Sequence, residues 1–197
     1  MATPGEHRHH VTMTDVETLR RNARAHIEQG AVTKSYTGDR QKVLELLNNA
    51  LATELVCVLR YRRHHFMAKG LFSRAVADEF LQHSNEELGH ADQIAERIAQ
   101  LGGSPDWSPD SLSSRSHAEY VEGNSLLDMI REDLVAERVA IDSYREFIEY
   151  LGENDSTTRR MLEDILRVEE DHANELSDFL DQGADGHATE RVHRHNA

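Results

Sequence analysis

The feature that most constrains this chain is a Glu-x-x-His pattern that occurs twice, at Glu87–His90 and at Glu169–His172. Residues three apart lie on the same face of an α-helix, so each pair directs a carboxylate and an imidazole toward one point. Both pairs interrupt rows of apolar residues with helical spacing, where core side chains are expected. An ionisable group in an apolar core is destabilising unless a partner compensates it. We therefore expect both pairs to bind a partner inside the fold.

The spacing of apolar residues predicts an all-α chain, because Val, Ile and the aromatic residues recur with helical spacing and do not alternate. Ser125 and Asp128 form a capping box that would begin one helix, and Gly183 would end the last one. The four long helices are expected at residues 39–69, 73–101, 125–152 and 155–182.

The lengths of the connections predict how these helices are arranged. Loops of about three residues join the first helix to the second and the third to the fourth, which makes each pair antiparallel. The connection at residues 104–124 is long enough to run the length of a bundle, and it leaves room for a short helix at residues 113–120. A four-helix bundle with one long crossover between its second and third helices is the ferritin-like arrangement.

The sequence divides into three parts around this bundle. Residues 1–38 are expected to be an N-terminal arm with a short helix at residues 15–29 and a linker, residues 39–182 the bundle domain, and residues 183–197 a flexible His-rich tail. No run of about 18 apolar residues is present, so we expect no membrane span. A single cysteine, Cys57, and a polar N-terminus without the pattern of a secretory signal favour a cytoplasmic protein.

The composition is acidic, with a formal net charge of −14 at pH 7 when the histidines are neutral. The excess of acids lies in the bundle and not in the two ends. Such a surface attracts cations and repels a nucleic-acid backbone. Direct binding of DNA is therefore not expected.

Glu54 and Glu137 complete a set of four inward-facing acids, because each lies in the apolar row of its helix, as Glu87 and Glu169 do. Four charged carboxylates in one core would repel one another and lose their hydration, which a marginally stable domain does not tolerate. Two divalent cations would neutralise all four. Carboxylate and imidazole donors without a thiolate favour iron or manganese, and zinc fits the same donors but is redox-inert. We therefore expect a two-metal site at the middle of the bundle.

Three segments resemble bacterioferritins: residues 47–55 with Tyr61 and His64 after them, residues 86–98, and residues 169–172. The resemblance covers roughly residues 40–180. It implies a di-iron ferroxidase centre with two iron ions per subunit, in which Glu87 and Glu169 bridge the metals. It also implies that Tyr61 lies buried beside the centre and is hydrogen-bonded to a ligand carboxylate. The ligands that it implies are Glu54, Glu87, His90, Glu137, Glu169 and His172.

The chain departs from bacterioferritins at three places. Leu88 stands where they have the methionine that binds haem between subunits, so haem is not expected. The tail lacks the apolar face of the short fifth helix that closes their 24-subunit shells. The chain is in this respect more similar to the bacterioferritin-like branch of Dps-like mini-ferritins, although it has Cys57 alone where that branch often has a cysteine pair. The resemblance therefore implies a hollow homo-oligomer of 12 subunits rather than 24.

The function that these features predict is iron storage and detoxification, in which Fe²⁺ is oxidised with O₂ or H₂O₂ and Fe³⁺ is kept inside the shell. One alternative is a Dps-like protein of oxidative stress that protects DNA, against which the lack of a polybasic arm argues. Another is a di-iron or di-manganese peroxidase or catalase of the rubrerythrin kind, although no Cys-x-x-Cys pair is present for an electron-transfer module.

Three further residues have two interpretations each. His83, one turn before Glu87, is either a hydrogen-bonded core histidine or an outer metal ligand or iron-entry residue. His64 is either a residue that complements the dipole at a helix end or, by the resemblance, one that takes part in iron transit. Cys57 is expected to be a small buried hydrophobic residue, with a redox role as the alternative.

Overall fold

The structure is a computed structural model that describes residues 12–70 and 73–194, with side chains described up to residue 181. It is all-α, as predicted, and the described residues contain no β-strand. None of their helices is long and apolar enough to cross a membrane. The helices are α1 (Val16–Ala23), α2 (Arg40–Met67), α3 (Ser73–Gln100), α4 (Leu112–Arg115), α5 (Leu126–Leu151) and α6 (Ser156–Arg194), with 3₁₀ turns at Ile27–Gln29 and Pro109–Ser111.

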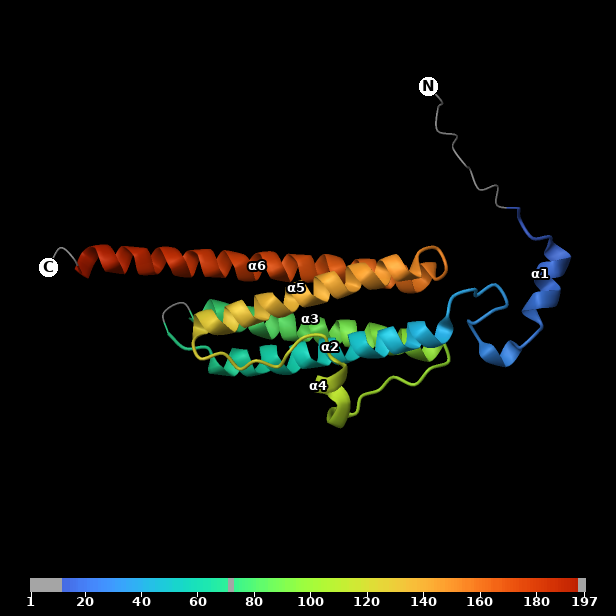
Figure 1. Cartoon of the computed structure of the whole chain (residues 1–197), viewed down its shortest axis with the longest axis horizontal. Coiled ribbons are helices and arrows are strands. Elements are labelled where there is room, and N and C mark those ends of the chain that lie inside the picture. Colours follow the sequence, from blue (N-terminus) through green and yellow to red (C-terminus); the bar gives the residue numbers. More distant parts are fainter. Residues whose placement is uncertain (1–11, 71–72, 195–197) are drawn as a thin grey trace, which may run out of the picture.

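Four long helices, α2, α3, α5 and α6, lie side by side as a bundle (Figure 1). α2 and α3 form one antiparallel pair and α5 and α6 the other, and the connection between α3 and α5 runs along α2 from one end of the bundle to the other (Figure 1). The predicted four-helix bundle with a long crossover is therefore confirmed. Because α2 also packs on α5 and α3 on α6, the α2–α5 seam and the α3–α6 seam lie on opposite sides of the bundle.

Side-chain caps begin the helices close to where the sequence predicts them. The carboxylate of Asp39 accepts a hydrogen bond from the backbone N–H of Lys42 at 3.1 Å and begins α2. Ser125 accepts one from the N–H of Asp128 at 3.2 Å and begins α5, which confirms the predicted start of this helix. α5 ends at Gly152, whose φ of 49° lies in the left-handed region that glycine adopts without strain.

The last helix does not end before Gly183, so that prediction is wrong. α6 continues to Arg194, and its last turns extend beyond the other three bundle helices (Figure 1). A glycine inside a helix lowers stability by only about 0.5–1 kcal/mol relative to alanine, because it loses more backbone entropy on folding. It keeps its backbone N–H, so it can still donate the helical hydrogen bond. No proline follows to remove one, so the backbone hydrogen bonds can continue through Gly183.

The short helix expected at residues 113–120 is present but shorter. It covers Leu112–Arg115 and follows directly on a 3₁₀ turn. Contacts with α2 end it early: the backbone N–H of His117 donates to Oγ1 of Thr53 at 2.9 Å instead of continuing the helix. The helix expected at residues 15–29 is also shorter, because His26 adopts a left-handed conformation with φ 56° between α1 and the next turn. Residues 1–11 of the expected arm lie outside the described residues.

The core consists of two apolar clusters, one toward each end of the bundle, with a polar layer between them. Cys57 is 3% exposed and belongs to the second cluster, and burial raises the pKa of its thiol. Full burial of each large apolar side chain contributes about 1.5–3 kcal/mol, so the clusters can offset a costly polar layer. The first cluster includes Leu47, Leu51, Ile94, Ile98, Leu101, Tyr144, Phe147, Leu151, Leu162 and Ile165, and the second includes Tyr61, Val76, Phe80, Met129, Ile130 and Leu176.

A buried ion-pair network joins α2 to α5 and to the crossover. Nε of Arg60 donates to Oδ1 of Asp133 at 2.8 Å, and Nδ1 of His64 lies 2.8 Å from Oδ2 of the same carboxylate. Arg60 also donates to the backbone carbonyl of Glu119 at 2.7 Å. All three side chains of the network are at most 2% exposed. Asp133 was not singled out from the sequence, although its side chain is fully buried.

Removing the carboxylate of this network should destabilise the fold strongly. Asp133→Ala leaves the buried guanidinium of Arg60 without its counter-charge, and loss of one partner from a buried pair costs about 3–5 kcal/mol. Asp142→Ala is the matched control, because Asp142 is an exposed partner of Arg145 on the same helix and should change stability by at most about 0.5 kcal/mol. Urea unfolding of the metal-free protein measures both, and equal losses would contradict a special role for the buried pair.

Candidate metal centre

Four carboxylates and two imidazoles converge between the two apolar clusters, near the middle of the bundle. They come from all four long helices, with one acid each from α2 and α5 and one Glu-x-x-His pair each from α3 and α6. None of the six is more than 5% exposed. The structure therefore brings together all the ligands expected from the sequence: Glu54, Glu87, His90, Glu137, Glu169 and His172.

The six residues form two overlapping groups of four, and within each group the potential ligand atoms lie within 4.8 Å of one another. One group contains Glu54 and His90, the other contains Glu137 and His172, and Glu87 and Glu169 belong to both. The arrangement is therefore approximately twofold symmetric about the two shared carboxylates.

The distances within the two groups follow the same symmetry. Nδ1 of His90 lies 3.0 Å from Oε1 of Glu169 and 3.3 Å from Oε2 of Glu87. Nδ1 of His172 lies 3.5 Å from the other oxygen of each of these two carboxylates. Each shared carboxylate thus presents one oxygen to each half of the site, which is the geometry that a bridging ligand requires.

Several polar atoms in the site have no hydrogen-bond partner among the described residues. A buried polar atom left without a partner costs about 1–3 kcal/mol, and more if it is charged. These atoms face one another, so cations placed between them would satisfy several at once. The donor set therefore fits two divalent metal ions. The atoms are Oε2 of Glu54, Oε1 of Glu87, Oε2 of Glu137, both carboxylate oxygens of Glu169 and Nδ1 of His172.

Protons occupy part of this site when no metal is bound. Burial and the charge of Glu87 raise the pKa of Glu54 to about 8, and the pKa of Glu137 is raised well above its usual value by burial and by the charges of Glu87 and Glu169. Burial lowers the pKa of His172, but the nearby carboxylates of Glu169 and Glu87 outweigh it and raise this pKa to about 12. Metal ions bind the deprotonated groups, so their binding must release protons.

Two tyrosines hold the two unshared carboxylates. The hydroxyl of Tyr61 donates to Oε1 of Glu137, which is the kind of contact expected for it, and the hydroxyl of Tyr144 donates to Oε1 of Glu54. Tyr144 was not singled out from the sequence as a residue of the site. Its spacing of seven residues after Glu137 repeats that of Tyr61 after Glu54, and this repeat was the available signal. Burial raises the pKa of both phenols, so both remain protonated donors.

On the α3–α6 side, Glu86 orients the ligand His172, whereas Glu175 contacts His83, which is not one of the six expected ligands. Nε2 of His172 lies 2.7 Å from Oε2 of Glu86, which turns Nδ1 of this ring toward the centre. His83 is 0% exposed, and its Nε2 lies 2.9 Å from Oε2 of Glu175. The structure therefore supports the interpretation of His83 as a hydrogen-bonded core histidine, and it leaves its second interpretation open. Neither Glu86 nor Glu175 was singled out from the sequence.

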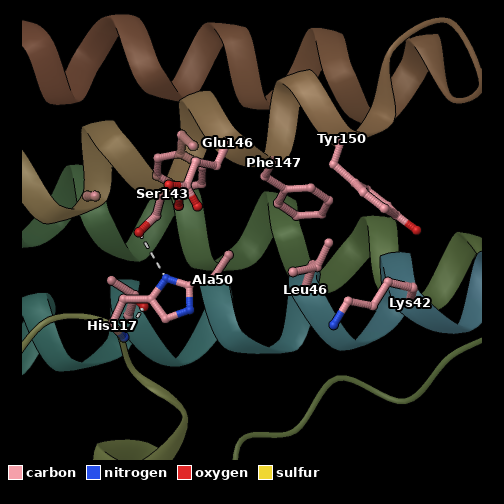
Figure 2. Close-up of a pocket in the computed structure, with 11 residues that line it drawn as sticks. Lys42, Leu46, Ala50, His117, Ser143, Glu146, Phe147 and Tyr150 are labelled. Atoms are coloured by element: carbon pink, nitrogen blue, oxygen red, sulfur yellow. Dashed lines mark hydrogen bonds between the residues drawn. The ribbon is translucent and has the colours of Figure 1, made fainter.

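A cavity of about 220 Å³ opens between α2 and α5 (Figure 2). It lies on the α2–α5 side of the bundle, whereas His83 and His172 have their contacts on the α3–α6 side. Leu46 and Phe147 line it, and His117 of the crossover hydrogen-bonds to Ser143 across one end at 2.9 Å (Figure 2). Tyr144 also lines the cavity while it donates to Glu54. One phenol ring therefore separates this largely apolar cavity from the metal centre.

Comparison with known sequences gives consistent matches over most of the chain. The profile of a family described as "Ferritin-like domain" matches residues 44–185. A bacterioferritin of Rhodobacter capsulatus is 32% identical over 141 residues, which cover 71% of this chain and 81% of that protein. A nutrient stress-induced DNA-binding protein of a Nostoc species is 32% identical over 174 residues, which cover 85% of this chain and 92% of that protein.

Solved structures give the same result for the fold. The dodecameric thioferritin of Bacteroides fragilis, described as bacterioferritin-related, superposes with a TM-score of 0.74 at 28% identity and covers 77% of this chain and 91% of that one. The bacterioferritin of Desulfovibrio desulfuricans, described with a diiron site, superposes with a TM-score of 0.67 at 26% identity and covers 76% of this chain and 86% of that one.

Divalent metal should stabilise the folded protein through the shared carboxylates. Zn²⁺ is redox-inert, and free Zn²⁺ at 100 times its dissociation constant should add about 2.7 kcal/mol for each site that it fills. Glu169→Gln removes a charge from both groups and should lose most of this gain, whereas Glu170→Gln changes a neighbour that pairs with Arg145 at the surface and should keep it. Calorimetry with and without Zn²⁺ measures the effect. An equal rise in Tm for both variants would count against the site.

Proposed function

The chain belongs to the ferritin-like domain family, and from this membership we propose that it oxidises Fe²⁺ at the two-metal centre and stores the Fe³⁺ product in a hollow homo-oligomer. The observation that carries the proposal is the pair of overlapping ligand groups that share Glu87 and Glu169. Iron storage as the general role is what its bacterioferritin relatives indicate. The oxidant, O₂ or H₂O₂, is part of the proposal.

In this proposal each metal ion has one unshared carboxylate and one imidazole. Glu54 and His90 would hold one ion, Glu137 and His172 would hold the other, and the two shared carboxylates would serve both ions. Carboxylate and imidazole donors suit iron and manganese, and zinc would bind without redox chemistry. Two iron ions per subunit follow from the two groups.

The protein's own groups provide negative charge, orient two of the carboxylates and limit the access of water to the site. Four carboxylates in a site of low polarity favour the more highly charged Fe³⁺ over Fe²⁺ and so make iron easier to oxidise. Glu54 and Glu137 give up their protons when the ions bind, and the hydroxyls of Tyr61 and Tyr144 fix the orientation of these two carboxylates. The apolar clusters on both sides limit access of water to the centre.

Storage requires a space that a single bundle does not have, because its interior is filled by the two clusters. We therefore propose that the space lies between subunits of a closed shell. One of the structural relatives is a dodecamer, which supports 12 subunits.

A Dps-like role in protecting DNA is the second candidate function. The observation that favours it is the Nostoc relative, named a DNA-binding protein, which is similar over 85% of this chain. The acidic composition, with a net charge of −14, opposes contact with a phosphate backbone. A gel-shift assay at low and at physiological salt distinguishes DNA protection from iron storage alone. Only a protein that binds DNA would slow the migration of a DNA duplex, and it would do so less at higher salt.

Loss of a ligand should abolish rapid oxidation of Fe²⁺ while the bundle stays folded. We expect Glu87→Ala and His172→Ala each to lower the initial rate by at least about tenfold, because changes around a metal site already cost this much in its second shell. Asp171→Ala is the control, because Asp171 is exposed and adjacent to His172. Stopped-flow absorbance gives the rate and circular dichroism the helicity. Wild-type rates in both ligand variants would refute the ferroxidase assignment, and turnover of H₂O₂ without deposition of iron would favour the peroxidase alternative.

The purified protein should be a large hollow assembly. Light scattering at physiological salt should give a mass of roughly 12 times the subunit mass of 22.4 kDa, because closed shells are built from repeated symmetric contacts. A mass near one or two subunits would exclude storage between subunits, even if the metal centre were correct.

A further inference from the structure

A second cluster of potential metal ligands lies on the α3–α6 seam, outside the two-metal centre. It consists of Glu79 and His83 of α3 and Glu175 of α6, whose ligand atoms lie within 4.8 Å of one another. Nε2 of His83 is 2.9 Å from Oε2 of Glu175 and 3.4 Å from Oε1 of Glu79. The imidazole is 0% exposed, whereas the side chains of Glu79 and Glu175 are 25% and 48% exposed. The cluster therefore has a buried nitrogen and an outer side that is open to solvent.

The hydrogen bonds within this cluster leave it only partly satisfied. Nε2 of His83 carries at most one hydrogen, yet two carboxylates approach it. Nδ1 of the same fully buried ring has no hydrogen-bond partner among the described residues. A divalent cation between the three side chains would neutralise both acids and take the lone pair of Nε2, with the ring proton on Nδ1.

The cluster is continuous with the two-metal centre. The ring of His83 stacks on that of His172, with centroids 3.9 Å apart and planes at 20°. His83, His172 and Glu137 themselves form a group whose ligand atoms lie within 4.8 Å of one another. Successive groups thus share residues, from the exposed Glu175 through His83 to the inner ligands Glu137 and His172.

We propose that Glu79, His83 and Glu175 form a third divalent-cation site, from which ions pass to the two-metal centre along the α3–α6 side. The inference rests on the proposed function, because it supplies that centre with its metal. Two carboxylates and one imidazole bind Fe²⁺, Mn²⁺, Co²⁺ or Zn²⁺ without filling all their coordination positions, so a bound ion keeps water and can leave. The cavity on the α2–α5 side is lined mainly by apolar groups and by Lys42, which does not suit a cation.

Anomalous diffraction from crystals soaked anaerobically in Co²⁺ tests the site directly. Wild-type protein should show two peaks at the centre and a third between Glu79, His83 and Glu175. The double variant Glu79→Gln/Glu175→Gln, which keeps side-chain shape, should retain the two central peaks and lose the third. Glu149→Gln, an exposed change on α5, should retain all three.

The outcomes separate this inference from the proposed function. Filled central positions with no third peak in the wild type would overturn the third site and leave the proposed function standing. Empty central positions at the same Co²⁺ concentration would count against the proposed function itself.

The rate of iron oxidation provides a second readout. With Fe²⁺ well below saturation, the double variant should oxidise it about tenfold more slowly than the wild type, because loading is impaired. At saturating Fe²⁺ the two rates should agree within about twofold, since the central ligands are unchanged, whereas a general structural defect would lower both rates. Equal rates at low Fe²⁺ would show that ions do not load through this site.

Discussion

Four carboxylates converge in a core that excludes most water, and the free-energy cost of holding them there is the constraint on which the rest of the structure depends. The effective cost of burying an unpaired ion is several kcal/mol, comparable with the whole stability of a domain. Without metal, protons on Glu54 and Glu137 and hydrogen bonds from Tyr61 and Tyr144 reduce this cost. The same unsatisfied charge attracts cations, so we infer that the destabilisation and the proposed function have one origin.

The site is held by rigid elements whose spacing is fixed by polar contacts on both sides of it. In one of them, the ion pair of Arg60 and Asp133 connects α2 to α5. In the other, Asp155 caps α6 through the N–H of Thr158 and accepts two hydrogen bonds from Arg97 of α3, at 2.9 and 3.1 Å. Ligands on helices that are fixed in this way keep their relative positions better than ligands on loops, which a bridging geometry requires.

The two open seams of the bundle differ in chemistry. The α3–α6 seam presents carboxylates and a buried imidazole that lead to His172, whereas the α2–α5 seam presents an apolar cavity that ends at Tyr144. A charged metal ion and a small neutral molecule would therefore meet different surfaces on their way to the same centre. A net charge of −14 gives electrostatic repulsion with phosphate-rich partners.

The sequence by itself determined the helices, their antiparallel pairing and the inward direction of the six polar residues, because helical periodicity, caps and loop lengths are local properties. Contacts between helices were decided only by the tertiary structure, since they depend on the register of segments far apart in the chain. Tyr144 hydrogen-bonds to Glu54, which is 90 residues away in the sequence, and His172 hydrogen-bonds to Glu86, which is 86 residues away. The C-terminal extent of α6 was also missed, because Gly183 permits a helix to end but does not require it.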